Sequence, residues 1–322
     1  MWSAVTALME QSIGSVFPSA QLVVLDGELR WSQAFGACSP STIFDLASLT
    51  KPLSTVMLIA QLLEQRRATL DQKIAGGHVV RQLLSHSSGL PGWKALAPPG
   101  VVDKQRVLDE IARTPLEYEP GSRSVYSDLG FILLGELAAD HLGPLDLAFT
   151  TRIAAPLGID ARLGFHPEAA TCAPTEGELR GVVHDDNARA MGGVAGHAGL
   201  FGTADDVATV AHSLLSTWHG ASGLISPSLL RTLWSPAGVP GSTWCLGWDR
   251  PAAHGSSAGE LWPKDGVGHL AFTGCSMWLD PPRRRAVVLV SNRVYPTRAN
   301  ERIRQLRPQL HDLIVKQLDQ RS

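Results

Sequence analysis

The sequence predicts an α/β (α+β) fold in which an antiparallel sheet is built from both ends of the chain and flanked by helices. Three observations predict it: a helix and a hairpin open the chain, helices and loops fill its middle, and strands followed by a helix close it. We expect a sheet domain of residues 1–77 and 222–322 and a mostly helical inserted domain of residues 78–221. The active site is then expected at their interface.

The opening segment is expected to form a helix and a hairpin. Apolar residues of 1–17 follow helical spacing until Pro18 ends the helix. The apolar runs 21–25 and 29–35 flank Asp26-Gly27, which is typical of a hairpin turn. Apolar residues of 50–65 then recur with a period of 3.6, which predicts a long buried helix.

The middle and the end of the chain are expected to differ in structure. Residues 78–190 are punctuated by Pro-Gly turns and predict helices and loops, with a helix over 129–142. Another helix is expected after Thr203, whose hydroxyl can cap it. The later segments that we expect to form strands are 244–248, 269–279 and 286–292, with a turn at 280–283. Residues 298–320 predict a final helix, bent or broken at Pro308.

Composition excludes several classes of protein. The 322 residues carry 28 Lys and Arg against 30 Asp and Glu, so no nucleic-acid partner is expected. No segment reaches the ~18 apolar residues of a membrane span, and residues 1–17 make a poor signal peptide. We expect a cytoplasmic protein, or a periplasmic one if a leader has been removed. The four cysteines form no C-x-x-C pair, so free thiols and no metal or cofactor are expected. The oligomeric state is not predicted.

Ser48-Leu49-Thr50-Lys51 is the first candidate for chemistry. Ser48 lies where the long apolar helix begins, and Lys51 follows one turn later on the same face. Free amides in a first helical turn favour negative charge, so Ser48 could act as a nucleophile with Lys51 taking its proton. The alternative is a helix cap and a solvated lysine.

Two further segments could complete such a site. Tyr126-Ser127-Asp128 precedes the helix over 129–142, and a hydroxyl there could relay protons. Its alternative role is a cap at Asp128 and a core position for Tyr126. In residues 268–274, small residues interrupt a strand, so a substrate carbonyl can approach the main chain closely. A backbone N–H there could stabilise an oxyanion. The alternative there is a close-packed strand with a satisfied His269.

Together these motifs resemble the serine β-lactamases and penicillin-binding proteins, and especially the class C β-lactamase-like serine hydrolases, which include esterases and D-amino-acid peptidases. The segments that carry the resemblance are Ser48-x-x-Lys51, Tyr126-x-Asp128, His269-Leu270-Ala271, 44–47, 83–90 and 196–201. It implies an acyl-enzyme on Ser48, with Lys51, held neutral by burial, or Tyr126 as the base. The N–H groups of Ser48 and Phe272 would hold the oxyanion.

The chain departs from the family pattern at two motifs. Asp128 replaces the usual asparagine, although Ser127 and Asp128 also match part of the S-D-N form. His269-Leu270-Ala271 replaces Lys-Thr-Gly, so the fixed positive charge is missing, and Ala271 narrows the strand edge. A neutral His269 can donate one hydrogen bond but attracts a carboxylate weakly. We therefore expect small esters or short peptides to be preferred to β-lactams. A weak class C-type β-lactamase and a non-catalytic peptide-binding protein are the alternatives.

Three other features compete with this interpretation. Gly255-Ser256-Ser257-Ala258-Gly259 matches G-x-S-x-G but lacks the strand and helix that a nucleophile elbow needs, so a loop is expected. His184 and Asp186 could bind a cation, but a polar loop along the cleft is the preferred interpretation. Tryptophans could line an apolar acyl pocket or belong to the core; they are Trp93, Trp244, Trp248, Trp262 and Trp278.

Overall fold

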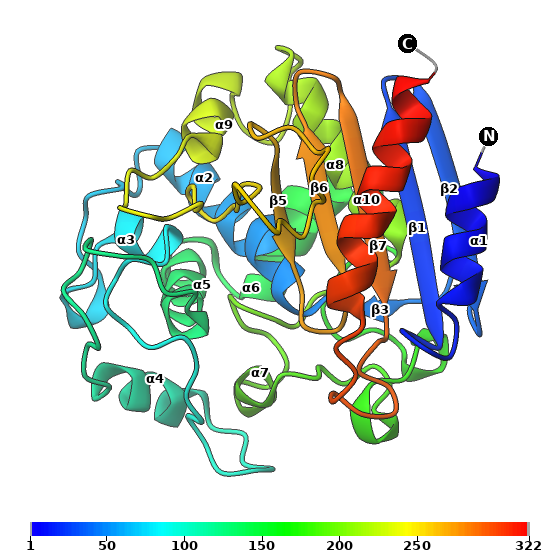
Figure 1. Ribbon diagram of the computed structural model, residues 1–322. Coiled ribbons are helices and arrows are strands. Elements are labelled where there is room, and N and C mark those ends of the chain that lie inside the picture. The colour runs from blue at the N-terminus through cyan, green and yellow to red at the C-terminus, as the bar shows by residue number, and fades with distance from the viewer. Residues whose placement is uncertain (1, 321–322) are drawn as a thin grey trace.

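A five-stranded antiparallel sheet forms the core of one half of the protein (Figure 1). A computed structural model describes residues 2–320. The strand order is β2-β1-β7-β6-β5, so strands from early and late in the chain lie side by side. The strands are β1 (Ser19–Asp26), β2 (Leu29–Gly36), β5 (Val267–Leu270), β6 (Ser276–Asp280) and β7 (Arg285–Ser291). The predicted sheet from both ends of the chain is confirmed.

The register of the sheet joins distant residues. A two-residue turn, Gly27-Glu28, connects β1 to β2, and β1 also pairs with β7, where Ala20 lies opposite Ser291. The strand predicted over 269–279 is wrong as a single element. A turn over 271–275 divides it into β5 and β6, because Gly274 adopts a φ of 104° and donates a hydrogen bond to Ala271 O.

The segment 244–248 was also expected to be a strand, and this prediction is wrong. It is a buried loop in which Gly247 has a φ of 80°. The chain reaches the sheet only at Asp249, which exchanges backbone hydrogen bonds with Gly268 of 2.8 and 2.9 Å. One bridge of this kind leaves β5 as the edge strand beside the loop.

Helices cover both faces of the sheet (Figure 1). Helices α1 (Ser3–Gln11) and α10 (Ile303–Asp319) pack together on one face, and α8 (Ala204–Trp218) packs on the other. Helix α10 continues through Pro308 and is not broken there. Proline removes only one helical N–H, and residues buried on both sides of it, such as Leu306 and Leu310, hold the helix against the sheet.

The other helices form the second half of the molecule, beyond β5. They are α2 (Val56–Glu64), α3 (Val80–Leu84), α4 (Lys104–Ala112), α5 (Asp128–Leu142), α6 (Leu145–Phe149), α7 (Asp186–Ala190) and α9 (Pro227–Trp234). A short ribbon pairs β3 (Phe44–Asp45) with β4 (Phe201–Gly202). The domain division stays a prediction; α8 lies within the range 78–221 yet packs on the sheet.

The cysteines and the apolar segments were the subject of two predictions from composition. All four cysteines carry free thiols, as predicted. No helix in residues 2–320 combines the length and the apolar character that crossing a membrane requires.

Candidate active site

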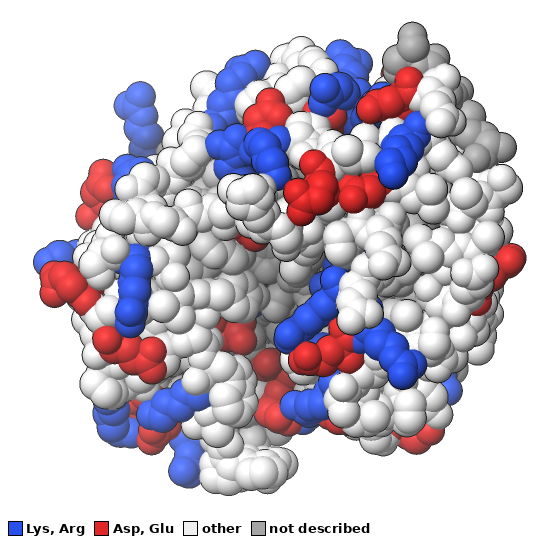
Figure 2. Space-filling view, in the orientation of Figure 1, with Lys and Arg blue, Asp and Glu red and all other residues white. Residues whose placement is uncertain are grey.

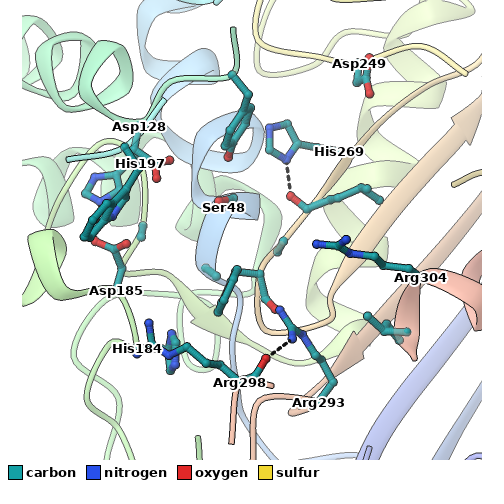
Figure 3. A pocket seen from close by; sticks show the side chains of 18 of the residues that line it. Ser48, Asp128, His184, Asp185, His197, Asp249, His269, Arg293, Arg298 and Arg304 are labelled. Atoms are coloured by element: carbon teal, nitrogen blue, oxygen red, sulfur yellow. Dashed lines mark hydrogen bonds and ion pairs between the residues drawn. The ribbon is translucent and has the colours of Figure 1, made fainter. Parts of the chain in front are cut away.

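A cavity of about 600 Å³ opens between β5 and the helical half of the molecule. Figure 2 shows the hollow near the centre of this face, with acidic and basic side chains around it. The predicted site residues that line it are Ser48, Tyr126, Asp128, His269, Ala271 and Phe272. The seventh, Lys51, lies fully buried against Ser48. The structure therefore brings together the three motifs (Figure 3).

Ser48 lies on a strained turn. It belongs to a 3-10 turn, Ala47–Leu49, which a π-helical turn, Lys51–Thr55, joins to α2. Ala47 has a φ of 44°, a left-handed conformation that is unfavourable for a residue with a Cβ. The carboxylate of Asp45 stabilises it by accepting the Ala47 N–H at 2.8 Å. The Ser48 N–H itself donates no hydrogen bond within residues 2–320.

Lys51 is surrounded by three acceptors. Its Nζ donates to Ser48 Oγ at 3.2 Å, to Asp128 Oδ1 at 2.7 Å and to His197 O at 3.1 Å. Burial lowers the pKa of Lys51, but the Asp128 carboxylate and Tyr126 outweigh burial, so the net pKa is raised. The expectation that burial holds Lys51 neutral is wrong, because Asp128 stabilises the ammonium.

Tyr126 packs within an aromatic cluster. Its ring centroid lies 4.6 Å from that of His86, 5.6 Å from that of Trp244 and 5.9 Å from that of His269. Its hydroxyl is buried without a hydrogen-bond partner in residues 2–320, and Lys51 Nζ lies 4.8 Å from the ring centroid. Burial raises the pKa of Tyr126, although the Lys51 ammonium opposes it. At rest the phenol therefore keeps its proton.

Ser127 has a different role from Tyr126. Its hydroxyl donates to Pro91 O at 2.7 Å and accepts from the Gly130 N–H at 3.4 Å, which makes it the cap of α5. The alternative in which Asp128 caps this helix is therefore wrong, and Asp128 is free to face Lys51. The residues of this motif that line the cavity are Tyr126 and Asp128, and Ser127 does not line it.

The third motif presents a neutral histidine. Nδ1 of His269 lies 2.7 Å from Leu270 O (Figure 3), and because a carbonyl only accepts, Nδ1 carries the proton. Burial, with Lys51 nearby, lowers the pKa of His269 to about 3. Its buried Nε2 has no partner within residues 2–320 and is an acceptor. The expectation that His269 donates a hydrogen bond to substrate is thus corrected.

Phe272 follows on the turn between β5 and β6. Its N–H donates no hydrogen bond within the described chain. The half-exposed ring stacks on His184, with ring centroids 5.5 Å apart, and Arg293 Cζ lies 4.5 Å from its centroid. An unpaired N–H at the cavity wall can donate a hydrogen bond to a developing oxyanion.

The contacts of several residues of the site were not predicted from the sequence. Asp45 stands next to the turn of Ser48, and its carboxylate also accepts the His184 N–H at 2.6 Å. Asp185 Oδ1 lies 2.7 Å from His197 Nε2 beside Lys51. These contacts join residues more than ten positions apart, so no local motif reveals them.

The features that competed with this interpretation in the sequence differ in their position relative to the cavity. Ser257 lies in a loop with no strand before it or helix after it, and it does not line the cavity. His184 and Asp186 line the cavity, but Asp186 pairs with Arg189, and residues 2–320 contain no cluster of three or more potential metal ligands. Of the tryptophans, the cavity includes Trp93 and Trp244, while the core includes Trp248, Trp262 and Trp278.

Comparison with known proteins identifies the family. The model of the family described as Beta-lactamase matches residues 4–311. The chain is 28% identical over 350 residues to an Escherichia coli (strain K12) protein named "Putative D-alanyl-D-alanine carboxypeptidase", covering 88% of this chain and 80% of the relative. It is 27% identical over 356 residues to the N-acetylmuramyl-L-alanine amidase of Bacillus subtilis (strain 168), covering 90% and 80%.

A solved structure shares the fold. The octameric penicillin-binding protein homologue from Pyrococcus abyssi superposes with a TM-score of 0.78 at 17% identity, over 97% of this chain and 77% of that one. The predicted resemblance is thus confirmed. The chain belongs to the Beta-lactamase family and is a hydrolase of the serine β-lactamase and penicillin-binding protein type.

Proposed function

We propose that this protein hydrolyses small esters or short peptide amides, including D-amino-acid peptides, through an acyl-enzyme on Ser48. The observation that carries the proposal is the contact of Ser48 Oγ with Lys51 Nζ, 3.2 Å apart at the wall of the cavity. In acylation, Ser48 Oγ bonds to the substrate carbonyl carbon and the π electrons move to oxygen. The leaving group then departs with a proton, and water releases the acyl group.

The oxyanion would be held by two backbone donors. The N–H groups of Ser48 and Phe272 have no other acceptor in residues 2–320, and both residues line the cavity. Preorganised donors of this kind lose no reorganisation energy as the charge develops. Ala271 is the last residue of the third motif and directly precedes Phe272.

The proton of Ser48 would pass to a coupled pair. Lys51 and Tyr126 both have raised pKa values, so the resting site holds one proton more than the reactive form. We infer that the active form lacks one proton shared between them, and that this form accepts the proton of Ser48. The rate should therefore rise with pH above neutrality.

The choice of substrate rests on charge. His269 is neutral where a lysine would be cationic, and a missing charge-assisted hydrogen bond is worth roughly 1.5–3 kcal/mol, or about 10–150-fold in affinity. The exposed arginines on the cavity wall are paired, Arg298 with Glu176 and Arg304 with Glu301 at 2.9 Å. The relatives named carboxypeptidase and amidase support an amide or peptide substrate.

A substrate panel with matched variants tests the proposal. The panel comprises p-nitrophenyl acetate, p-nitrophenyl butyrate, D-alanyl p-nitroanilide and nitrocefin, each with wild type, Ser48→Ala and Ser257→Ala. We expect ester or anilide kcat/KM well above that for nitrocefin, loss of turnover by several orders of magnitude in Ser48→Ala, and no change in Ser257→Ala. Intact mass after fluorophosphonate treatment should show one adduct, absent from Ser48→Ala.

Two outcomes would replace the proposal. Nitrocefin turnover equal to that of the esters would indicate a β-lactamase. A wild type that forms no adduct and turns over nothing, yet binds peptides, would indicate the non-catalytic alternative.

A further inference from the structure

Arg307 is a buried cation beside the turn between β5 and β6. It extends from the N-terminal part of α10, only 5% of its surface is exposed, and it forms no ion pair with a carboxylate in residues 2–320. Its Nη2 donates to Cys275 O at 2.8 Å and to Ala271 O at 3.2 Å. Its Nε is buried and has no acceptor in the described chain. Burying a guanidinium without a counterion is unfavourable. Its position therefore points to a functional role and not to a gain in stability.

One acceptor of Arg307 belongs to the peptide group that carries the Phe272 N–H. Ala271 O and the Phe272 N–H are the two ends of one peptide group. A cation bonded to the oxygen draws electron density through the amide and makes its N–H a stronger donor. The same two carbonyls accept the Gly274 and Ala271 N–H groups at 3.1 and 2.8 Å, so Arg307 also fixes the orientation of this peptide.

The charge of Arg307 is permanent under ordinary conditions. Burial lowers the pKa of Arg307 to about 10, so it stays protonated at pH 7–8. His269, at the position where the family pattern has a lysine, is neutral. A second buried arginine, Arg293, donates from Nε to Phe272 O at 2.7 Å. The carbonyls of Ala271 and Phe272, on either side of the Phe272 amide nitrogen, therefore each accept a hydrogen bond from a buried arginine.

We propose that Arg307 is a positioning residue for the reaction, which orients and polarises the Ala271–Phe272 peptide so that its N–H stabilises the oxyanion formed on Ser48 acylation. This inference rests on the proposed function, since it assumes that the Phe272 N–H meets that oxyanion. Arg307 acts only through the peptide, so its effect should appear in the transition state and hardly in ground-state binding.

The test compares Arg307→Met, Arg307→Lys and a control, Arg285→Met, using p-nitrophenyl butyrate. Arg285 is a similarly buried arginine on β7, but it pairs with Asp26 and Asp319 away from the cavity. We expect Arg307→Met to lower kcat about 10- to 100-fold with little change in KM, which is less than the effect of removing an oxyanion donor outright. Arg307→Lys should recover part of the rate, and Arg285→Met should keep the wild-type kcat.

Phenylboronic acid gives a readout that a purely structural role would not change. Boron accepts a lone pair from Ser48 Oγ and becomes an anionic tetrahedral centre that resembles the oxyanion intermediate. The Ki of phenylboronic acid should rise across the variants in proportion to the fall in kcat/KM. The Arg307→Lys variant should also lose activity as pH rises, at a lower pH than wild type does, because burial lowers the pKa of an ammonium.

Each other outcome has a defined meaning. A folded Arg307→Met variant with normal kcat, or a boronate Ki that does not follow kcat/KM, would overturn the inference while Ser48→Ala remains inactive. Unfolding of both Arg307 variants beside a folded Arg285→Met would show a purely structural role and would also overturn it. Turnover retained by Ser48→Ala would instead overturn the proposed function.

Discussion

Asp128 controls the charge of Lys51 through a 2.7 Å ion pair. It replaces the asparagine that is usual in the family pattern. We expect Asp128→Asn to move the rising limb of kcat/KM to lower pH, because Asp128 raises the pKa of both Lys51 and Tyr126 and its removal leaves burial to lower that of Lys51. The measurement is kcat/KM for p-nitrophenyl butyrate from pH 5 to 10.

The matched control is Asp186→Asn. Asp186 also lines the cavity, but it pairs with Arg189 rather than with Lys51. Its pH profile should keep the wild-type midpoint. An unchanged midpoint in Asp128→Asn would mean that the ion pair does not set the protonation of the catalytic base.

Lys51 and Tyr126 should behave as one unit. We expect Lys51→Ala and Tyr126→Phe each to lower kcat about 10²–10⁴-fold, the range for a positioned acid–base group. The double variant should lose much less than the product of the two factors, because either change already disables the shared proton transfer. Fully multiplicative losses in steady-state kinetics would show independent roles.

Asp45 should make stability depend on pH. Burial raises its pKa to about 6, against the opposing hydrogen bonds from the His184 and Ala47 N–H groups. The folded protein therefore binds a proton between pH 4 and 6 that the unfolded chain has released, and stability from this group is lost as pH rises through 6. The free energy of unfolding of wild type, minus that of Asp45→Asn, should fall by on the order of 2–3 kcal/mol between pH 4 and 7. Urea titrations at both pH values measure it, and a constant difference would contradict it.

At the scale of elements, the loop that carries His197 depends on contact between two glycines. Gly196 lies against α5, where an added Cβ would be 2.1 Å from Phe131 O and 2.8 Å from the Gly135 backbone. Gly196 O also accepts the Thr55 hydroxyl at 2.6 Å, and the next carbonyl, His197 O, accepts Lys51 Nζ. We expect Gly196→Ala to move this loop, to lower kcat about 10–100-fold and to destabilise the fold by about 1–3 kcal/mol.

Gly164→Ala is the control for this prediction. An added Cβ at Gly164 meets nothing within 4 Å, and its φ is not in the left-handed region. Steady-state kinetics and thermal unfolding should show a lower kcat and a lower Tm for Gly196→Ala and wild-type values for Gly164→Ala. Equal behaviour of the two would show that the approach of α5 to the loop is not needed.

The elements that the sequence predicts well are those with local signals. The Thr203 hydroxyl and the Asp206 carboxylate form a capping box at the start of α8, and Gly27 makes the first hairpin turn. The turn between β5 and β6 was missed, because Phe272 and Thr273 have high β-propensity and only Gly274 signals a turn. The motifs located the site, but the charge of Lys51 could not be predicted, since Asp128 lies 77 positions away in sequence.

At the scale of the whole molecule, β7 joins two cores. Its Val288 packs into the core shared with the helical half, and its Leu289 packs into the core beneath α1 and α10. We expect Leu310→Ala in α10 to destabilise the protein by about 2–5 kcal/mol. Loss of p-nitrophenyl butyrate turnover, tryptophan fluorescence and circular dichroism should shift together in urea. A separate early transition in any one of them would show that the two cores unfold independently.

The position of β7 in the centre of the sheet has a consequence for how the protein is made. Strand β1 needs residues 285–291 as its partner, so the first hairpin emerges from the ribosome with one edge bare while more than two hundred residues follow. Such an edge can pair with other nascent chains, and closing so long a loop is slow. The Phe272 amide is also translated late. The growing chain therefore cannot act on substrate until synthesis has passed the last strand.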